Sequence, residues 1–78
     1  MAQPLTHKSV WKALDKLANQ QGLTPSGLAR RAGLDATTFN PSKRRAKGGR
    51  QRWPSTESIA KVLEATRTGV DEFFSLLD

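Results

Sequence analysis

Helix start and stop signals recur at short intervals along this chain and divide it into short helices. The strongest start signal is Thr24-Pro25, because a threonine N-cap followed by proline at the first helical position favours a helix. Gly22 and Gly33 mark stops, since glycine adopts the left-handed conformation that ends many helices. No segment alternates polar and apolar residues with a period of two, so the sequence predicts no strand.

These signals predict an all-α fold, a compact bundle of five short helices in a single domain spanning residues 1–78. The five helical segments are expected to begin at about Thr6, Thr24, Asp35, Ser55 and Val70. We expect the third segment to end near Asn40, because Pro41 lacks an N–H donor and disfavours the helical conformation in the residue before it.

Length and composition exclude several classes of protein. The 78 residues include no cysteine, so neither a disulfide nor a thiolate metal site is available. The single histidine, His7, is expected at the surface, and no carboxylate pair or nucleophile–base pair is visible. No stretch approaches the ~18 apolar residues of a transmembrane helix, and no apolar signal segment is apparent at the N-terminus. We therefore expect a cytoplasmic bacterial or phage binding module, with no enzyme activity, cofactor, metal or membrane partner.

The positive charge of the chain is concentrated in one segment. The formal net charge is +6, and the sequence KRRAKGGRQR at 43–52 carries six cations and no acid. The six cations are Lys43, Arg44, Arg45, Lys47, Arg50 and Arg52. We predict a basic loop over 42–54 with a polyanion as its partner. The alternative is a loop that only improves solubility.

The segment 24–41 is predicted to form a helix-turn-helix. Two helices joined by a short turn containing glycine are typical of this motif, and Gly33 supplies the turn. Ala29 is small enough for the second helix to cross closely, while Leu34 and Phe39 fill the angle between the helices. Such a unit places the start of its second helix in the major groove of DNA.

These residues resemble a known family. LARRAGL at 28–34, followed by Phe39, is similar to the helix-turn-helix of the phage-repressor family (lambda-repressor-like, Cro/cI-type or XRE), and the resemblance extends through 53–63 and 70–74. More narrowly, FNPSKR and GRQRWPSTESIAKVLEAT resemble the N-terminal DNA-binding domains of phage repressors that carry a LexA-like peptidase domain. The resemblance implies the lambda-repressor-like fold and a transcriptional regulator that binds double-stranded DNA. It implies a repressor that acts as a homodimer on a palindromic operator, either standing alone or followed by a peptidase-like domain in a longer native chain.

The resemblance also implies site residues. The base-reading positions of the family match Ala36, Thr37, Thr38 and Asn40. The phosphate-binding positions match Thr24, Ser26, Lys43, Arg44, Arg50, Arg52 and Trp53, and the charge of the loop adds Arg45 and Lys47. The apolar C-terminal segment exceeds what one short helix buries, so Phe74 and Leu77 are candidates for a dimer interface.

Each assignment has a structural alternative. Thr37 and Thr38 are also suited to capping a first turn, and Asn40 to capping a helix end forced by Pro41. Trp11 is expected in the core, whereas Trp53 fits equally a cover over the core or a phosphate contact.

Two other functions use similar features. A DNA-binding antitoxin of a toxin–antitoxin pair uses the same motif, and co-purification with a neighbouring gene product would favour it. An RNA-binding protein needs exposed aromatic side chains for stacking, and only Trp53 qualifies.

Overall fold

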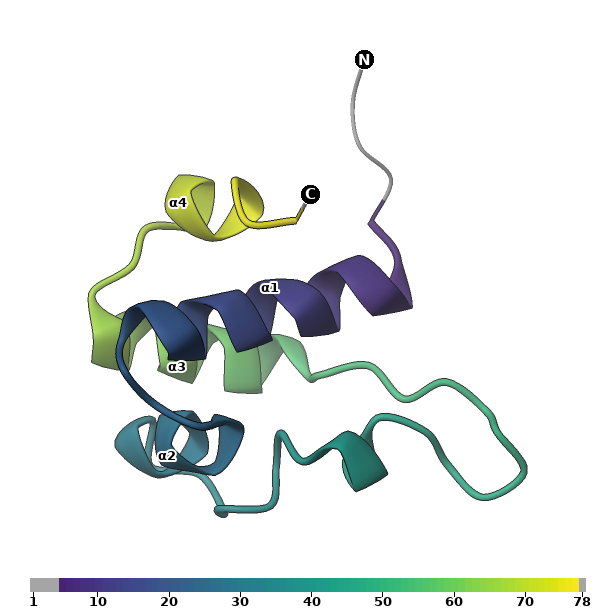
Figure 1. Ribbon diagram of the computed structural model, residues 1–78. Helices are drawn as coiled ribbons and strands as arrows, with labels where there is room; N and C mark the ends of the chain where they lie inside the picture. The colour runs from purple at the N-terminus through teal and green to yellow at the C-terminus, as the bar shows by residue number, and fades with distance from the viewer. Residues whose placement is uncertain (1–4, 78) are drawn as a thin grey trace.

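The helices begin at the capping residues that the sequence indicates. A computed structural model describes residues 5–77 (Figure 1). Its elements are α1 (His7–Gln20), α2 (Pro25–Arg31), the 3₁₀ turn η1 (Pro41–Lys43), α3 (Thr56–Thr66) and α4 (Val70–Phe74). Within 5–77 there are thus four α-helices and no strand, and none of these helices has the length and apolar character needed to cross a membrane.

Side chains satisfy the free backbone donors at the helix starts. Thr6 Oγ1 accepts a hydrogen bond from the backbone N–H of Ser9 at 3.0 Å, and Ser9 Oγ accepts one in return from the backbone N–H of Thr6 at 3.0 Å. Thr24 Oγ1 accepts from the backbone N–H of Gly27 at 3.1 Å, with Pro25 at the first helical position. Ser55 caps α3 in the same way. The predicted starts of these three helices are confirmed.

The predicted third helix is wrong, so the expected bundle of five helices is reduced to four. Residues 36–39 form a turn, which two backbone hydrogen bonds close: Thr38 N donates to Asp35 O at 3.0 Å, and Asn40 N donates to Thr37 O at 3.1 Å. We call this segment, with its flanking residues, the 35–40 turn. The Asp35 carboxylate accepts from the Thr37 backbone N–H at 2.8 Å, which favours a local turn over a helical ladder. Asn40 is extended, with ψ of 144°, as the following Pro41 requires. Too few residues lie between Asp35 and Pro41 to offset these local effects.

The core gathers around α1. Figure 1 shows α4 on one side of α1 and α2 on the other. Val10, Leu14 and Leu17 lie on one face of α1 and are buried. The other buried apolar side chains are Trp11, Ala13, Ala18, Leu28, Ala29, Phe39, Val62 and Phe73. Every helix and the 35–40 turn therefore contribute to one core, with α1 at its centre.

The turn after α2 follows the prediction for Gly33. This residue has a φ of +74°, a region that costs L-residues energy and that glycine adopts freely. The backbone N–H of Leu34 then donates to Ala29 O at 2.9 Å, which closes the end of α2. The chain leaves α2 directly into the 35–40 turn.

The predicted loop at 42–54 has more structure than expected. It begins within η1 and continues into a hairpin over residues 44–52, which we call the basic hairpin. Arg45 and Gln51 form an isolated antiparallel bridge, and Arg52 N donates to Arg44 O at 3.0 Å. At the tip, Gly49 N donates to Ala46 O at 3.0 Å, and Gly48 has a φ of +87°. In Figure 1 the hairpin projects away from the helices.

Candidate nucleic-acid interface

The basic hairpin and the end of η1, which precedes it, carry the exposed cations predicted to bind phosphate. The side chains of Lys43, Arg45, Lys47, Arg50 and Arg52 are exposed, and none of the five forms a salt bridge with a described residue. Arg45 makes one contact within the hairpin, from Nη1 to Gly49 O at 3.3 Å. The hairpin thus presents concentrated positive charge to solvent, where a polyanion has access to it.

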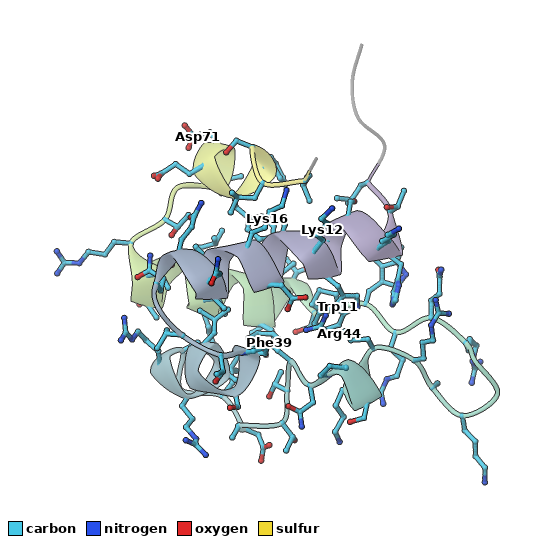
Figure 2. The ribbon with its side chains drawn as sticks, in the orientation of Figure 1. Trp11, Lys12, Lys16, Phe39, Arg44 and Asp71 are labelled. Carbon is cyan, nitrogen blue, oxygen red and sulfur yellow. The ribbon has the colours of Figure 1, made fainter. Side chains whose placement is uncertain are left out.

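Arg44 differs from its neighbours. Its guanidinium donates two hydrogen bonds to the Asp15 carboxylate, from Nη2 to Oδ1 at 2.7 Å and from Nη1 to Oδ2 at 2.9 Å. Nη2 also donates to Phe39 O at 2.8 Å, and Cζ lies 4.7 Å from the centroid of the Trp11 ring. Figure 2 shows Arg44 beside Trp11 below α1. Contacts within the protein therefore occupy the guanidinium predicted to bind phosphate, and only 15% of the Arg44 side chain is exposed.

Residues of α1 hold the two ends of the hairpin. His7 Nε2 lies 2.8 Å from Arg44 O and 3.0 Å from Arg52 O. Trp11 Nε1 donates to Arg52 O at 2.9 Å. The surface position expected for His7 is wrong, since only 8% of the residue is exposed, whereas the core position expected for Trp11 is confirmed. No local pattern could have revealed this use of His7, because its backbone partners lie 37 and 45 residues away.

Three of the four predicted base-reading residues, Ala36, Thr37 and Thr38, lie in the 35–40 turn with little free hydrogen-bonding capacity. Thr37 Oγ1 donates to Asp35 Oδ1 at 2.6 Å, and Thr38 Oγ1 donates to Asp35 O at 2.6 Å. Both hydroxyl protons are therefore used within the turn, and the oxygens retain only their acceptor capacity. The alternative role, capping the first turn of a helix, does not apply, because residues 36–39 form a turn that no α-helix follows. Ala36 is half-buried and offers only its methyl group.

Hydrogen bonds from Thr37 also change the acidity of Asp35. The Thr37 hydroxyl and the Thr37 backbone N–H stabilise the ionised carboxylate and lower the pKa of Asp35 below its usual value, with a smaller contribution from Lys43. Asp35 therefore remains a hydrogen-bond acceptor at neutral pH.

Asn40 is the predicted reader with an uncommitted polar side chain. Its backbone N–H donates to Thr37 O and its carbonyl accepts from Lys43 N at 2.8 Å, but no described residue hydrogen-bonds to its amide group. The residue is half-buried. An amide in this state retains the donor and acceptor that bidentate pairing with adenine requires.

A polar groove brings several predicted residues together. The groove has a volume of about 440 Å³ and lies between the 35–40 turn and the start of α3. Its lining includes Thr37, Thr38, Lys43, Arg52 and Trp53 from the predicted set. Ser55, the N-cap of α3, and Ser58 in its first turn also line the groove, and the sequence indicates Ser55 only as a cap. Cations, hydroxyls, the Asp35 carboxylate and the rings of Trp11 and Trp53 thus share a single surface.

The other predicted positions lie outside this groove. Arg45 lines a second groove, of about 530 Å³, together with Lys8, Lys12 and Ser42. Lys47 and Arg50 belong to the tip of the hairpin and line neither groove.

Thr24 and Ser26, the phosphate-binding positions predicted at the start of α2, have their hydroxyls 3.2 Å apart, and Thr24 also caps the helix. These two residues line neither groove.

Trp53 covers a buried residue and is also partly exposed, so its predicted phosphate contact stays a prediction. Its ring packs edge-on against His7, with centroids 5.9 Å apart and an interplanar angle of 79°. At the same time 48% of the residue is exposed. One part of the ring therefore covers the buried histidine while the rest faces solvent beside Arg52.

The two predicted dimer residues differ in exposure. Phe74 is 55% exposed and lines an apolar groove of about 350 Å³ with Leu5 and Val70, which are also exposed. Leu77 is half-buried and packs against the core. Phe74 thus belongs to an open apolar surface, whereas Leu77 contributes in part to the fold.

In comparisons with known proteins, no protein-family model, no curated protein and no solved structure matches the chain. Within the described residues, no three His, Asp or Glu side chains gather into a group able to hold a metal ion.

Proposed function

We propose that this chain is a double-stranded DNA-binding domain of a transcriptional regulator, a repressor and not an enzyme, with the lambda-repressor-like fold. The observation that carries the proposal is a group of five exposed cations that form no salt bridge with a described acid. They are Lys43 of η1 and Arg45, Lys47, Arg50 and Arg52 of the basic hairpin. Lysine and arginine in this state bind phosphates and release the counterions condensed on DNA.

The surface next to the hairpin supports duplex DNA over an unspecific polyanion. Thr37 and Thr38 line the polar groove together with the cations Lys43 and Arg52. Asn40 lines neither groove but ends the same turn, where its carbonyl accepts a hydrogen bond from Lys43 N at 2.8 Å. Phosphate contacts fix the position of a protein on DNA, and contacts to base edges supply the specificity. In this proposal the base-reading element is a turn, with Asn40 as its principal reader, and the hairpin binds the adjacent backbone.

The proposal includes a homodimer on a palindromic operator. The apolar groove beside Phe74, with Leu5 and Val70 exposed around it, is the surface that we assign to the dimer contact. Two copies related by twofold symmetry place their reading turns in half-sites about one helical turn apart.

The test is selection from a random duplex library with this chain at two salt concentrations. We expect an enriched palindrome and strong salt dependence. A dimer that neutralises about ten phosphates gives a slope near −9 for log K against log[salt]. Salt-sensitive binding without an enriched sequence would contradict the base-reading part of the proposal, and no duplex binding at low salt would contradict all of it.

Two variants separate phosphate binding from base reading. Arg50→Gln should weaken binding to every duplex alike and reduce the slope, whereas Asn40→Ala should relax the preference at one base pair of each half-site. Arg67→Asn is the matched control for charge, because Arg67 follows the end of α3 that points away from the hairpin (Figure 1), and asparagine tolerates its φ of 55°. It should leave both properties unchanged. An unchanged operator preference in Asn40→Ala would remove Asn40 from the reading set.

A further inference from the structure

His7 is a buried polar residue that the proposed DNA contacts do not use. It occupies the first turn of α1, and its Nε2 atom reaches both ends of the basic hairpin, at Arg44 O (2.8 Å) and Arg52 O (3.0 Å). The helix that carries it is fixed in the core by Val10 and Leu14. His7 therefore joins the most firmly packed element of the molecule to the hairpin.

The partners of His7 determine where its ring proton lies. Two carbonyl oxygens face Nε2, and a carbonyl only accepts hydrogen bonds. The Trp11 N–H is shared between two acceptors, His7 Nε2 at 3.1 Å and Arg52 O at 2.9 Å. The two carbonyls favour a proton on Nε2, whereas the Trp11 N–H favours a lone pair there. We assign the proton to Nε2, because it then serves both carbonyls while the Trp11 N–H keeps Arg52 O as its acceptor. With this assignment the ring is a donor to the hairpin.

The hairpin itself has few internal restraints. Its two chain segments are joined by the hydrogen bonds from Arg52 N to Arg44 O and from Ala46 N to Arg50 O (2.6 Å), by the long contact from Arg45 Nη1 to Gly49 O (3.3 Å) and by the tip turn. Short two-stranded hairpins are at best marginally stable on their own. Contacts from α1 are therefore needed to fix the direction of the hairpin relative to the rest of the molecule.

We propose that His7 is a positioning residue that holds the basic hairpin in the orientation in which its cations bind DNA phosphates. The inference rests on the function proposed above. His7 contacts no DNA in this scheme and acts through the hairpin, by removing the cost of ordering it when DNA binds.

The test compares two substitutions of His7. His7→Phe keeps a ring in the site and removes the donor, while both carbonyls retain another partner, in Arg52 N–H and Trp11 N–H. His7→Gln restores an N–H donor at nearly the same distance from the backbone. We expect His7→Phe to weaken binding to a mixed-sequence duplex at low salt by about two- to tenfold, the value of one hydrogen bond, and His7→Gln to recover most of the loss.

A double-mutant cycle separates positioning from simple loss of folded protein. The same His7→Phe change is made in a Lys47→Gln/Arg50→Gln background, which lacks the two cations of the hairpin tip. If His7 acts through the hairpin, its effect on affinity shrinks in that background. A fall in the folded fraction would reduce affinity by the same factor in both backgrounds, and that result would overturn the proposal.

Amide hydrogen exchange provides a readout that does not need DNA. We expect His7→Phe to accelerate exchange at the amides of Ala46, Gly49 and Arg52 while the amides of α1 from Leu14 to Ala18 stay protected. Uniform acceleration, or no change in the hairpin, would overturn the positioning role while the proposed function stands. If the unmodified chain binds no duplex, the proposed function fails, and the role of His7 in DNA binding fails with it.

Discussion

The helices and the 35–54 segment hold their backbones in different ways. In α1 and α3 the backbone groups pair within the helix, and a nearby hydroxyl caps the first turn. In the 35–54 segment, side chains from α1 and from the segment itself bind key carbonyls: Arg44 binds Phe39 O, and His7 and Trp11 bind Arg52 O. The shape of a helix here is therefore a local property, whereas the shape of the proposed DNA interface depends on residues distant in sequence.

The largest expected effect concerns the aromatic anchor of the 35–54 segment. Phe39 is 1% exposed and packs edge-on against Trp11, with ring centroids 6.2 Å apart. We expect Phe39→Ala to lower the free energy of unfolding by about 3–5 kcal/mol, enough to unfold much of a chain of this size. Urea denaturation followed by circular dichroism measures the change. The control Phe74→Ala, at an exposed phenylalanine, should cost far less, and equal losses would show that Phe39 is no anchor.

The next effect distinguishes two adjacent arginines. Arg44→Gln breaks the paired hydrogen bonds to Asp15 and the contacts to Phe39 O, so we expect a loss of about 1–3 kcal/mol in the free energy of unfolding. Arg45→Gln should change stability by less than about 0.5 kcal/mol, because its side chain is exposed. Affinity for duplex DNA, measured by fluorescence anisotropy on the folded fraction, should fall in Arg45→Gln. A stable Arg44→Gln protein with weakened salt dependence would instead assign Arg44 to phosphate.

A helix cap gives a smaller effect confined to the helical part. Thr24→Ala removes the acceptor for Gly27 N and should cost about 1 kcal/mol. Thr24→Ser keeps the hydroxyl and should recover most of that stability. Hydrogen exchange should increase mainly in the first turn of α2, and an equal increase across the basic hairpin would contradict the separation of the two regions.

The smallest effect is on the pH dependence of the 35–40 turn. Because hydrogen bonds from Thr37 lower the pKa of Asp35, the ionised carboxylate stabilises the turn above the ordinary carboxyl pKa, and this contribution is lost as pH falls through the lowered value. Thr37→Val removes the hydroxyl bond and should raise the Asp35 pKa toward its usual value. An NMR titration of the Asp35 carboxyl carbon measures both proteins, and identical titration curves would contradict the assigned cause.

The predictability of each element from sequence follows the same division. The helix starts at Thr6, Thr24 and Ser55 can be predicted from sequence, because each capping side chain bonds a backbone N–H only three residues later. The sequence predicts a helix from Asp35 because an aspartate followed by threonines resembles a helix start. The bonds from Thr37 to Asp35, which favour a turn, use the same residues and so leave no distinct pattern in the sequence. His7 and Arg44 gave no sign of their roles, since contacts with partners 29 to 45 residues away exist only after folding.

At Gly48, in the tip of the basic hairpin, the backbone limits the chirality of the residue but leaves space for a side chain. A side chain at Gly48 would meet no atom within 4 Å, yet the φ of +87° disfavours any L-residue there. A D-alanine introduced by chemical synthesis fits this backbone without strain, whereas L-alanine opposes it. The mirror-image residue would thus stiffen the tip and leave its cations in place, so chirality alone becomes a means of tuning how the hairpin meets its partner.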